Sequence, residues 1–531
     1  MTESGFTGTV PLVRLIVKRD WLLLAAWAIV MIVLAAIVVA SFGKLYPTPE
    51  ALKEFADSVT GNTGEIALLG NVLSPTLGGI TAWRLIMPAF IIGGLASLLA
   101  VIHYTRSEEE TGRRELIDST AIGQYAVLAS ALIVAFGVNL VIAIMSMLAF
   151  LGFGLPAAGS AALALSIGAS GCLMAGVGAI AAQLAQNTGT ARGIAGVVLA
   201  VAYILRVIGD GANLPLLSWL SFTGWMQQMR PFAGEQWWVL LLFVVSTVVL
   251  AVAAFSLHSK RDIDTGLLPQ RPGPEHASAW LNSPLTLAWR LQKGMLLGWV
   301  AGYALIGLLI GYLANTVAEQ LAANPQFMEY LKHLGGNATP ADSFFTMGVM
   351  ILGEITAAYA LLATLKIQSE ETESHAETVL SGPVGRLQWM AGHLAIALAG
   401  TVVVLLTFGI CAGLTYGLSN GNAGMVILRV MAAVLAYVPA IWVIAGLAVA
   451  LFGALPRFTL AAWAAFVGCL LLELAGELQL VSGVILDISP FTHVSKLLVS
   501  DLAILPMAAL VVIALAFMAI GLAGFQRRDV D

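Results

Sequence analysis

Long apolar runs, separated by short polar connections, dominate the chain. A transmembrane helix needs about 20 apolar residues to cross a hydrocarbon core roughly 30 Å thick, and most of the runs have that length. The runs are continuous rather than alternating, which is typical of helices and excludes a transmembrane β-barrel. The pattern predicts twelve spans, near residues 21–41, 81–104, 125–152, 161–185, 191–209, 237–257, 294–315, 343–365, 388–416, 425–453, 458–476 and 503–525.

Composition supports an all-α polytopic membrane protein. Of the 531 residues, 59% are hydrophobic and 10% are charged, whereas about 25% of the residues in an ordinary soluble domain are charged. A soluble protein of this length could not bury so much apolar surface. A soluble enzyme, a nucleic-acid-binding protein and a disordered chain are therefore excluded.

The basic residues predict the orientation. Most of the 25 Lys and Arg residues lie before the first span, after the last span, or in connections that follow an even-numbered span. Cytoplasmic connections of membrane proteins carry an excess of Lys and Arg. We therefore expect these connections and both termini to be cytoplasmic.

An internal repeat divides the twelve predicted spans into two sets of six. The segment 107–123, SEEETGRRELIDSTAIG, aligns without gaps with the segment 369–385, SEETESHAETVLSGPVG. Both segments connect the second and third spans of a set. The sets also end alike, with KRD at 260–262 and RRD at 527–529.

The repeat predicts the domain organisation. We expect a first six-helix half at 1–262, a Pro-rich cytoplasmic linker at 263–282, and a second six-helix half at 283–531. The halves have parallel orientation, related by a pseudo-two-fold axis along the membrane normal. Such halves are typical of transporters.

The sequence lacks the motifs that would support chemistry within this chain. Gly43 and Lys44 are followed by leucine and have no glycine-rich loop before them, so no Walker A motif is present. No GxSxG nucleophile motif occurs, and the seven histidines show no metal-ligand spacing. We expect the chain to be non-catalytic by itself and to hold neither a metal nor a cofactor.

Three segments carry a resemblance to a known family: PLVRLIVKRDW at 11–21, SEEETGRREL with its echo SEETESHAET, and KRDIDTGLLPQRPGP from residue 260. With them, nearly the whole chain resembles an ABC-2 type transporter permease of the fused, double-length form. It is most similar to the tetronasin-type exporters of polyketide antibiotics found in actinobacteria. The resemblance implies the ABC-2 exporter fold and a place in the bacterial plasma membrane.

The resemblance also implies a partner and a cargo. The partner is a separate ABC ATPase in two copies, which supplies ATP and Mg²⁺, and the cargo is an amphipathic drug or polyketide-like antibiotic. In that family the connection between the second and third spans docks on the ATPase. Carried over to this sequence, the resemblance implies that six glutamates couple the chain to the ATPase: Glu108, Glu109, Glu115, Glu370, Glu371 and Glu377.

The fifth and eleventh predicted spans are short, and each ends in a pair of charged residues. Arg206 and Asp210 lie one helical turn apart, as do Glu473 and Glu477. Short spans at matched places in two repeats indicate a substrate path in secondary transporters. One interpretation is an interfacial pair on each helix. The other is an outer gate, in which Arg206 and Glu473 face each other across the pseudo-symmetry axis.

One further acid, Glu354, lies inside a predicted span. A charge in mid-membrane costs about 2.5–3.5 kcal/mol on insertion scales, so Glu354 either binds a cationic substrate, titrates, or is a satisfied structural carboxylate. Large aromatic and Met side chains are candidates for lining a substrate cavity, although such residues on membrane helices more often serve plain packing. These candidates are Met87, Phe90, Tyr203, Met347 and Met350.

Two other functions remain open at this stage. A proton-coupled secondary transporter of the major facilitator type also has twelve spans, and Gly112, Arg113 and Arg114 match part of its loop motif. The Asp-Arg that precedes this motif in that class is absent, however. A membrane enzyme would need a polar catalytic cluster, which the sequence does not show.

Overall fold

The computed structural model describes residues 5–60, 66, 69–110, 122–261, 266–268, 276, 278–323, 339–372, 375–477 and 483–528, without the side chains of 316, 317, 319–323 and 474–477. The chain divides into two compact units, Met1–Gly273 and Pro274–Asp531. Each unit has its own hydrophobic core. The boundary lies inside the predicted linker, and the homology of the two halves stays a prediction.

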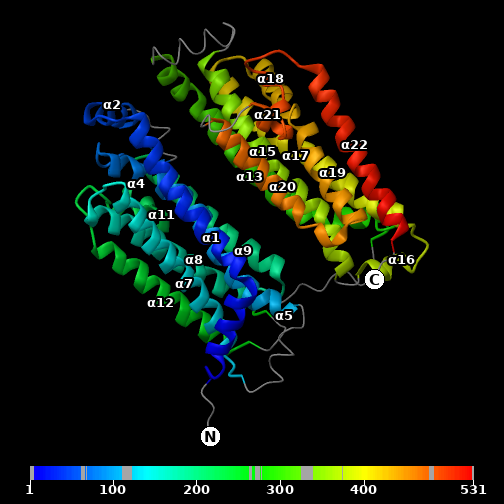
Figure 1. The fold of residues 1–531 in the computed structure, drawn as a ribbon, viewed down its shortest axis with the longest axis horizontal. Helices are drawn as coiled ribbons and strands as arrows, with labels where there is room; N and C mark the ends of the chain where they lie inside the picture. Colours follow the sequence, from blue (N-terminus) through cyan, green and yellow to red (C-terminus); the bar gives the residue numbers. More distant parts are fainter. Residues whose placement is uncertain are drawn as a thin grey trace. The chain divides into compact units, whose positions relative to one another are not determined.

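The first unit is a bundle of long helices, of which α7, α8 and α12 lie side by side (Figure 1). Short helices connect the long ones. The elements of this unit are α1 (Thr9–Leu45), α2 (Pro49–Thr60), α4 (Leu77–Ile102), η1 (His103–Ser107), α5 (Glu108–Glu110), α7 (Ala126–Gly152), α8 (Ala157–Leu184), α9 (Thr188–Gly211), α10 (Pro215–Trp219), α11 (Phe222–Gln228) and α12 (Trp238–His258).

The second unit is also a bundle of long helices. Its elements are α13 (Pro284–Ala323), α15 (Pro340–Thr372), α16 (His375–Leu380), α17 (Arg386–Ser419), α18 (Ala423–Leu435), α19 (Val438–Ala454), η2 (Pro456–Phe458), α20 (Ala461–Glu477), α21 (Gly483–Leu486), η3 (Pro490–His493) and α22 (Ile504–Arg527). The span predicted near 425–453 is thus interrupted between α18 and α19, at Ala436 and Tyr437.

Among the described residues, eleven helices are long and apolar enough to cross a membrane. They confirm an all-α polytopic membrane protein. The span predicted near 458–476 falls on α20, which has 17 residues and is short for a membrane span. The chain forms a 3₁₀ turn at η2 just before it, and this turn delays the start of the helix. The twelve-span count and the side of the termini stay predictions.

Helix packing follows the same order in both units. In the first unit α1 packs against α7, α4 against α8, and α12 against α8. In the second unit α13 packs against α17, α15 against α19, and α22 against α19. Counted as spans, the first therefore contacts the third, the second contacts the fourth, and the sixth contacts the fourth in each unit.

Small residues allow the closest of these contacts. A Cβ atom on Gly178 of α8 would lie 2.7 Å from the carbonyl oxygen of Leu98 on α4. Gly453 of α19 and Gly521 of α22 likewise face each other backbone to backbone. Glycines at such crossings let helix backbones approach closely, which is how membrane helices gain packing energy without a hydrophobic driving force.

The amphipathic stretch at 11–21 is continuous with the first span. Both belong to α1, and the two parts meet at Asp20, whose backbone is non-helical with φ −112° and ψ 21°. Leu12 and Ile16 are buried in the first part, whereas Trp21 and Leu22 are exposed. In the segment before the kink, the face that carries Leu12 and Ile16 therefore packs against the rest of the first unit.

Candidate functional site

The three consecutive glutamates of the first repeat, Glu108–Glu110, form the short helix α5 at the end of the second span. A π-helical turn, η1, comes directly before them. π-Helical turns are rare and occur often at functional sites. The wider turn contains Arg106, whose side chain is buried beside the glutamates.

Glu109 is the centre of a buried ion network. Its carboxylate accepts a hydrogen bond from Arg106 at 2.7 Å and another from Arg261 at 2.8 Å. The side chains of Arg106, Glu109 and Arg261 are 1%, 2% and 3% exposed. Arg261 lies just beyond the end of α12, so this network joins the second span to the sixth.

The neighbouring glutamates reach two other helices. Glu108 pairs with Arg19 of α1 at 2.9 Å. Glu110 accepts hydrogen bonds from the backbone N–H of Thr188, at 3.0 Å, and from the hydroxyl of the same residue, at the start of α9. The three glutamates of α5 thus contact the first span, the residue after the sixth span and the fifth span.

The second repeat keeps part of this arrangement. Glu371, near the end of α15, forms an ion pair with Arg528, which directly follows α22. The two side chains are 15% and 17% exposed. The guanidinium of Arg528 also lies over the rings of Phe452, at 4.8 Å, and Phe525, at 5.4 Å. The second and sixth spans are therefore joined in this unit as well.

Glu370 has more local partners than its counterpart Glu108. It pairs with Lys366 one turn earlier on the same helix at 2.9 Å, and His375 of α16 lies 3.5 Å away. Thr372 stands where the first repeat has its third glutamate. Among the described residues, the second unit thus has no counterpart of the Glu110 contact to the fifth span.

The other two predicted coupling residues differ in their outcome. Glu377 is exposed on α16, where a partner protein could contact it. Glu115 lies outside the described residues. The structure places Glu108, Glu109, Glu370 and Glu371 in ion pairs within their own units, and the proposed ATPase contact at these positions stays a prediction.

Arg261 and Arg528 were not among the predicted site residues. The signal for them was present in the matched endings of the two halves, at 260–262 and 527–529. A repeated acid and a repeated base in one chain suggest a repeated pair, although sequence alone does not show that they meet.

Arg206, a candidate gate residue, is completely buried inside the first unit. Its Nε donates to Asp210 at 2.9 Å, and its Nη1 lies 3.0 Å from the sulfur of Met87. Asp210 also accepts a hydrogen bond of 2.6 Å from Ser218 of α10. The predicted i, i+4 pair of Arg206 and Asp210 therefore forms and ties the fifth span to the short helix that follows. The gate pairing with Glu473 stays a prediction.

In the second unit, Glu354 of α15 and Glu473 of α20 both lie within electrostatic reach of Tyr437. Both carboxylate side chains are partly buried. Tyr437 stands at the break between α18 and α19, and its ring lies against Gly353. The side chain of Glu477 lies outside the described residues. The break between α18 and α19 thus carries an aromatic residue that interacts electrostatically with both acids.

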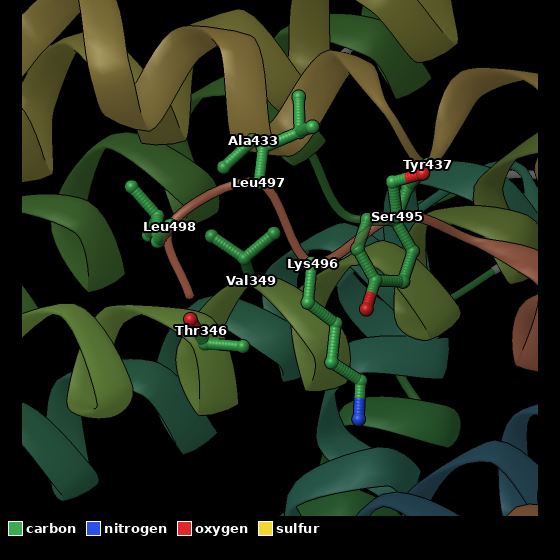
Figure 2. A pocket seen from close by; sticks show the side chains of 8 residues that line it. All are labelled: Thr346, Val349, Ala433, Tyr437, Ser495, Lys496, Leu497 and Leu498. Carbon is green, nitrogen blue, oxygen red and sulfur yellow. The ribbon is translucent and has the colours of Figure 1, made fainter. Parts of the chain in front are cut away.

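Tyr437 also lines a small cavity (Figure 2). Figure 2 shows Tyr437, Ser495 and Lys496 toward one side of this cavity and Thr346 and Leu498 toward the other. The lining segment around Ser495 connects η3 to α22. That it lies on the outer side of the membrane stays a prediction.

The predicted cavity residues have different surroundings. Met87 and Phe90 are fully packed in the core of the first unit, and Tyr203 lies beside the Arg206 guanidinium at 5.8 Å. Met347 is 53% exposed on the second unit, and Met350 is partly buried. None of these five lines the cavity of Figure 2. Their role as substrate contacts stays a prediction.

Comparisons with known proteins identify the family. A family model described as the C-terminal domain of the multidrug efflux system permease Rv1217c matches residues 281–526. The multidrug efflux system permease protein Rv1217c of Mycobacterium tuberculosis (strain ATCC 25618 / H37Rv) is 39% identical over 528 residues, which cover 99% of this chain and 96% of that protein. With eleven apolar helices among its described residues, the chain is a multi-pass protein of the bacterial plasma membrane. It belongs to the family of the multidrug efflux permease Rv1217c.

Proposed function

We propose that the chain is the membrane subunit of an ATP-driven exporter of the ABC-2 type. Two copies of a separate ABC ATPase bind ATP and Mg²⁺ and power it. Two findings support this proposal: membership of a multidrug efflux permease family, and a glutamate-bearing helix end after the second span of each unit. The second finding carries the proposal, because two matched helix ends suit a partner present in two copies.

In this mechanism the ATPase subunits contact the cytoplasmic segments 107–123 and 369–385. ATP binding draws the two subunits together, and the movement reaches the spans through the helix ends. The substrate path then changes from facing the cytoplasm to facing the outside. The residues of this chain perform no nucleotide chemistry. Their role is to transmit the movement of the ATPase subunits to the membrane spans.

The proposed cargo is an amphipathic, largely apolar small molecule, such as a drug or a polyketide-like antibiotic of the tetronasin type. The name of the relative supports multidrug efflux. The polyketide-like cargo is taken from the resemblance of the sequence to the tetronasin-type group. An apolar cargo fits a membrane domain in which charged side chains are few and Arg206 and Asp210 neutralise each other in a pair.

Affinity purification tests this proposal. The chain is expressed together with the ATPase encoded beside it and, as a control, alone. We expect the ATPase to be retained and the complex to hydrolyse ATP in the presence of Mg²⁺, whereas the chain alone does not. Loss of the ATPase under gentle conditions, with dye export that stops when the proton gradient is dissipated, would contradict the proposal and favour a proton-coupled transporter.

A point variant tests the contact region itself. We expect Glu377→Arg to reduce the amount of ATPase retained, because this exposed carboxylate lies on α16. The matched control is Asp487→Arg, which reverses an exposed carboxylate in a connection predicted to lie outside the cell. Equal retention in both variants would remove Glu377 from the contact.

A further inference from the structure

One ion pair occurs at the same place in both units. Glu109 pairs with Arg261 in the first unit, and Glu371 pairs with Arg528 in the second. Each glutamate is the second of its repeat, and each arginine is the second basic residue of the ending that the two halves share. Both pairs therefore fasten the cytoplasmic end of the second span to the residue that follows the sixth span.

The surroundings make each pair hard to separate. In the first unit Arg106 gives Glu109 a second cationic partner, and all three side chains are almost completely buried. In the second unit Arg528 donates to the carbonyl oxygen of Phe452 at 3.0 Å and lies over two aromatic rings. Arg386 of α17 donates in turn to the carbonyl oxygen of Arg528 at 2.6 Å.

We expect a buried ion pair of this kind to couple the movements of the two helix ends that it joins. Removing one partner leaves an uncompensated charge away from water, which is strongly unfavourable. The two helix ends are therefore expected to move together whenever one of them is displaced. Hydrogen bonds between charged groups in a low local dielectric are also stronger and more directional than those in water.

We infer that Arg261 and Arg528 are positioning residues for energy coupling, which hold the end of the second span in each unit against the end of the sixth. This inference rests on the proposed function for the source of the movement. A displacement that the ATPase imposes on the segment after the second span then reaches the sixth span directly. Glu109 and Glu371 act inside the chain in this arrangement, as the anchors of the arginines.

Hydrogen exchange and ATP hydrolysis together test the inference. The variants are Arg528→Glu and the charge swap Glu371→Arg/Arg528→Glu, with Arg527→Glu as the matched control because Arg527 is exposed beside Arg528. Amide exchange at residues 367–372 is measured on the purified chain without the ATPase. Ethidium-stimulated ATP hydrolysis is measured on the complex.

We expect Arg528→Glu to speed amide exchange at 367–372 and to lower ethidium stimulation about fivefold or more, the lower end of typical coupling between sites. Basal hydrolysis and the amount of retained ATPase stay unchanged. The charge swap restores both readouts, and Arg527→Glu changes neither. If Arg528→Glu behaves like Arg527→Glu, or if a stably folded swap variant restores neither readout, the inference is wrong.

The first unit provides a second test. Arg261→Glu is compared with the swap Glu109→Arg/Arg261→Glu and with the exposed neighbour control Lys260→Glu, with exchange followed at 103–110. If Arg261→Glu does not fold, the swap and the second-unit variants still decide the inference. If the wild-type complex shows no ethidium-stimulated hydrolysis, the proposed function is contradicted. The amide-exchange results then test on their own whether the ion pairs hold the helix ends together.

Discussion

The two units share one ion pair between the ends of the second and sixth spans but differ in what surrounds it. In the first unit, three consecutive glutamates contact three separate helices or helix ends, through Arg19, Arg261 and Thr188. In the second, Glu370 has partners close by in the sequence and Glu371 alone reaches the end of the sixth span. The first unit thus links its second span to three others, whereas the second unit has a single long-range link of this kind among its described glutamates.

The membrane interior shows a related difference. Arg206 of the first unit forms an ion pair with Asp210, whereas Glu473, which aligns with Arg206, interacts electrostatically with Tyr437. At this position the repeat retains a charge but not its sign, whereas the matched Asp210 and Glu477 are both acids.

The largest expected effect compares the two central glutamates. We expect Glu109→Gln to destabilise the chain by about 3–5 kcal/mol, because it leaves two buried arginines without their carboxylate. Glu371→Gln should cost roughly 1.5–3 kcal/mol, the range for one hydrogen bond to a charged group, since Arg528 keeps its aromatic contacts. Thermal unfolding of the purified chain in detergent measures both. Equal losses would contradict the difference between the units.

The second effect concerns the aligned charges in the fifth and eleventh predicted spans. Arg206→Met should cost about 3 kcal/mol, because it leaves the carboxylate of Asp210 with Ser218 as its remaining described donor. Glu473→Gln should have little effect on stability, because it replaces a partly buried charge with a neutral amide of the same size. The same unfolding assay compares them.

The charge swap Arg206→Glu/Glu473→Arg addresses the gate hypothesis. Recovery of dye export by the swap, after loss in both single variants, would support a functional pairing of these residues. If the swap does not restore export and Asp210→Asn also abolishes it, the functional partner of Arg206 is Asp210 of the same unit and not Glu473.

A smaller effect is expected at Glu354. If this carboxylate binds cationic cargo, Glu354→Gln should reduce export of ethidium about fivefold, a typical coupling magnitude, and leave export of the neutral dye Nile red unchanged. The neutral dye is the internal control for folding and for the energy supply. Equal reduction for both dyes would indicate a structural carboxylate instead.

The smallest expected effect makes the first unit resemble the second. Glu110→Thr introduces the residue type that stands at the matched position, Thr372. It removes the contact to Thr188 at an exposed site and should cost about 0.5–1.5 kcal/mol. The readout is again thermal unfolding, with Glu109→Gln as the reference for a buried glutamate. A loss as large as that of Glu109→Gln would show that the α9 contact matters as much as the buried network.

The sequence predicted the membrane class and the place of most spans, because continuous apolar runs leave few alternatives. Of the two spans predicted to be short, α20 is short with 17 residues, whereas α9 has 24. The sequence did not predict the break at Tyr437, since turns within apolar runs have weak local signals. It also singled out Glu109 and Glu371 but not their partners. Arg261 lies 152 residues beyond Glu109, and such a pair exists only after the helices have packed.

The predicted cavity residues show another limit of sequence analysis. Met87, Phe90 and Met347 all lie on predominantly apolar helices without a continuous polar face, so amphipathicity does not distinguish the core side from the lipid side. The structure places the first two in the core and exposes the third. The i, i+4 pair of Arg206 and Asp210, by contrast, was predictable because local helix geometry determines it.

Transport in proteoliposomes tests the central claim most directly. The complex of this chain with its neighbouring ATPase is reconstituted, and ethidium uptake into the lumen is followed after ATP is added outside. The account predicts uptake that requires hydrolysable ATP and Mg²⁺ and continues when a protonophore removes any proton gradient. Uptake that follows an imposed proton gradient without ATP, and stops with the protonophore, would contradict it.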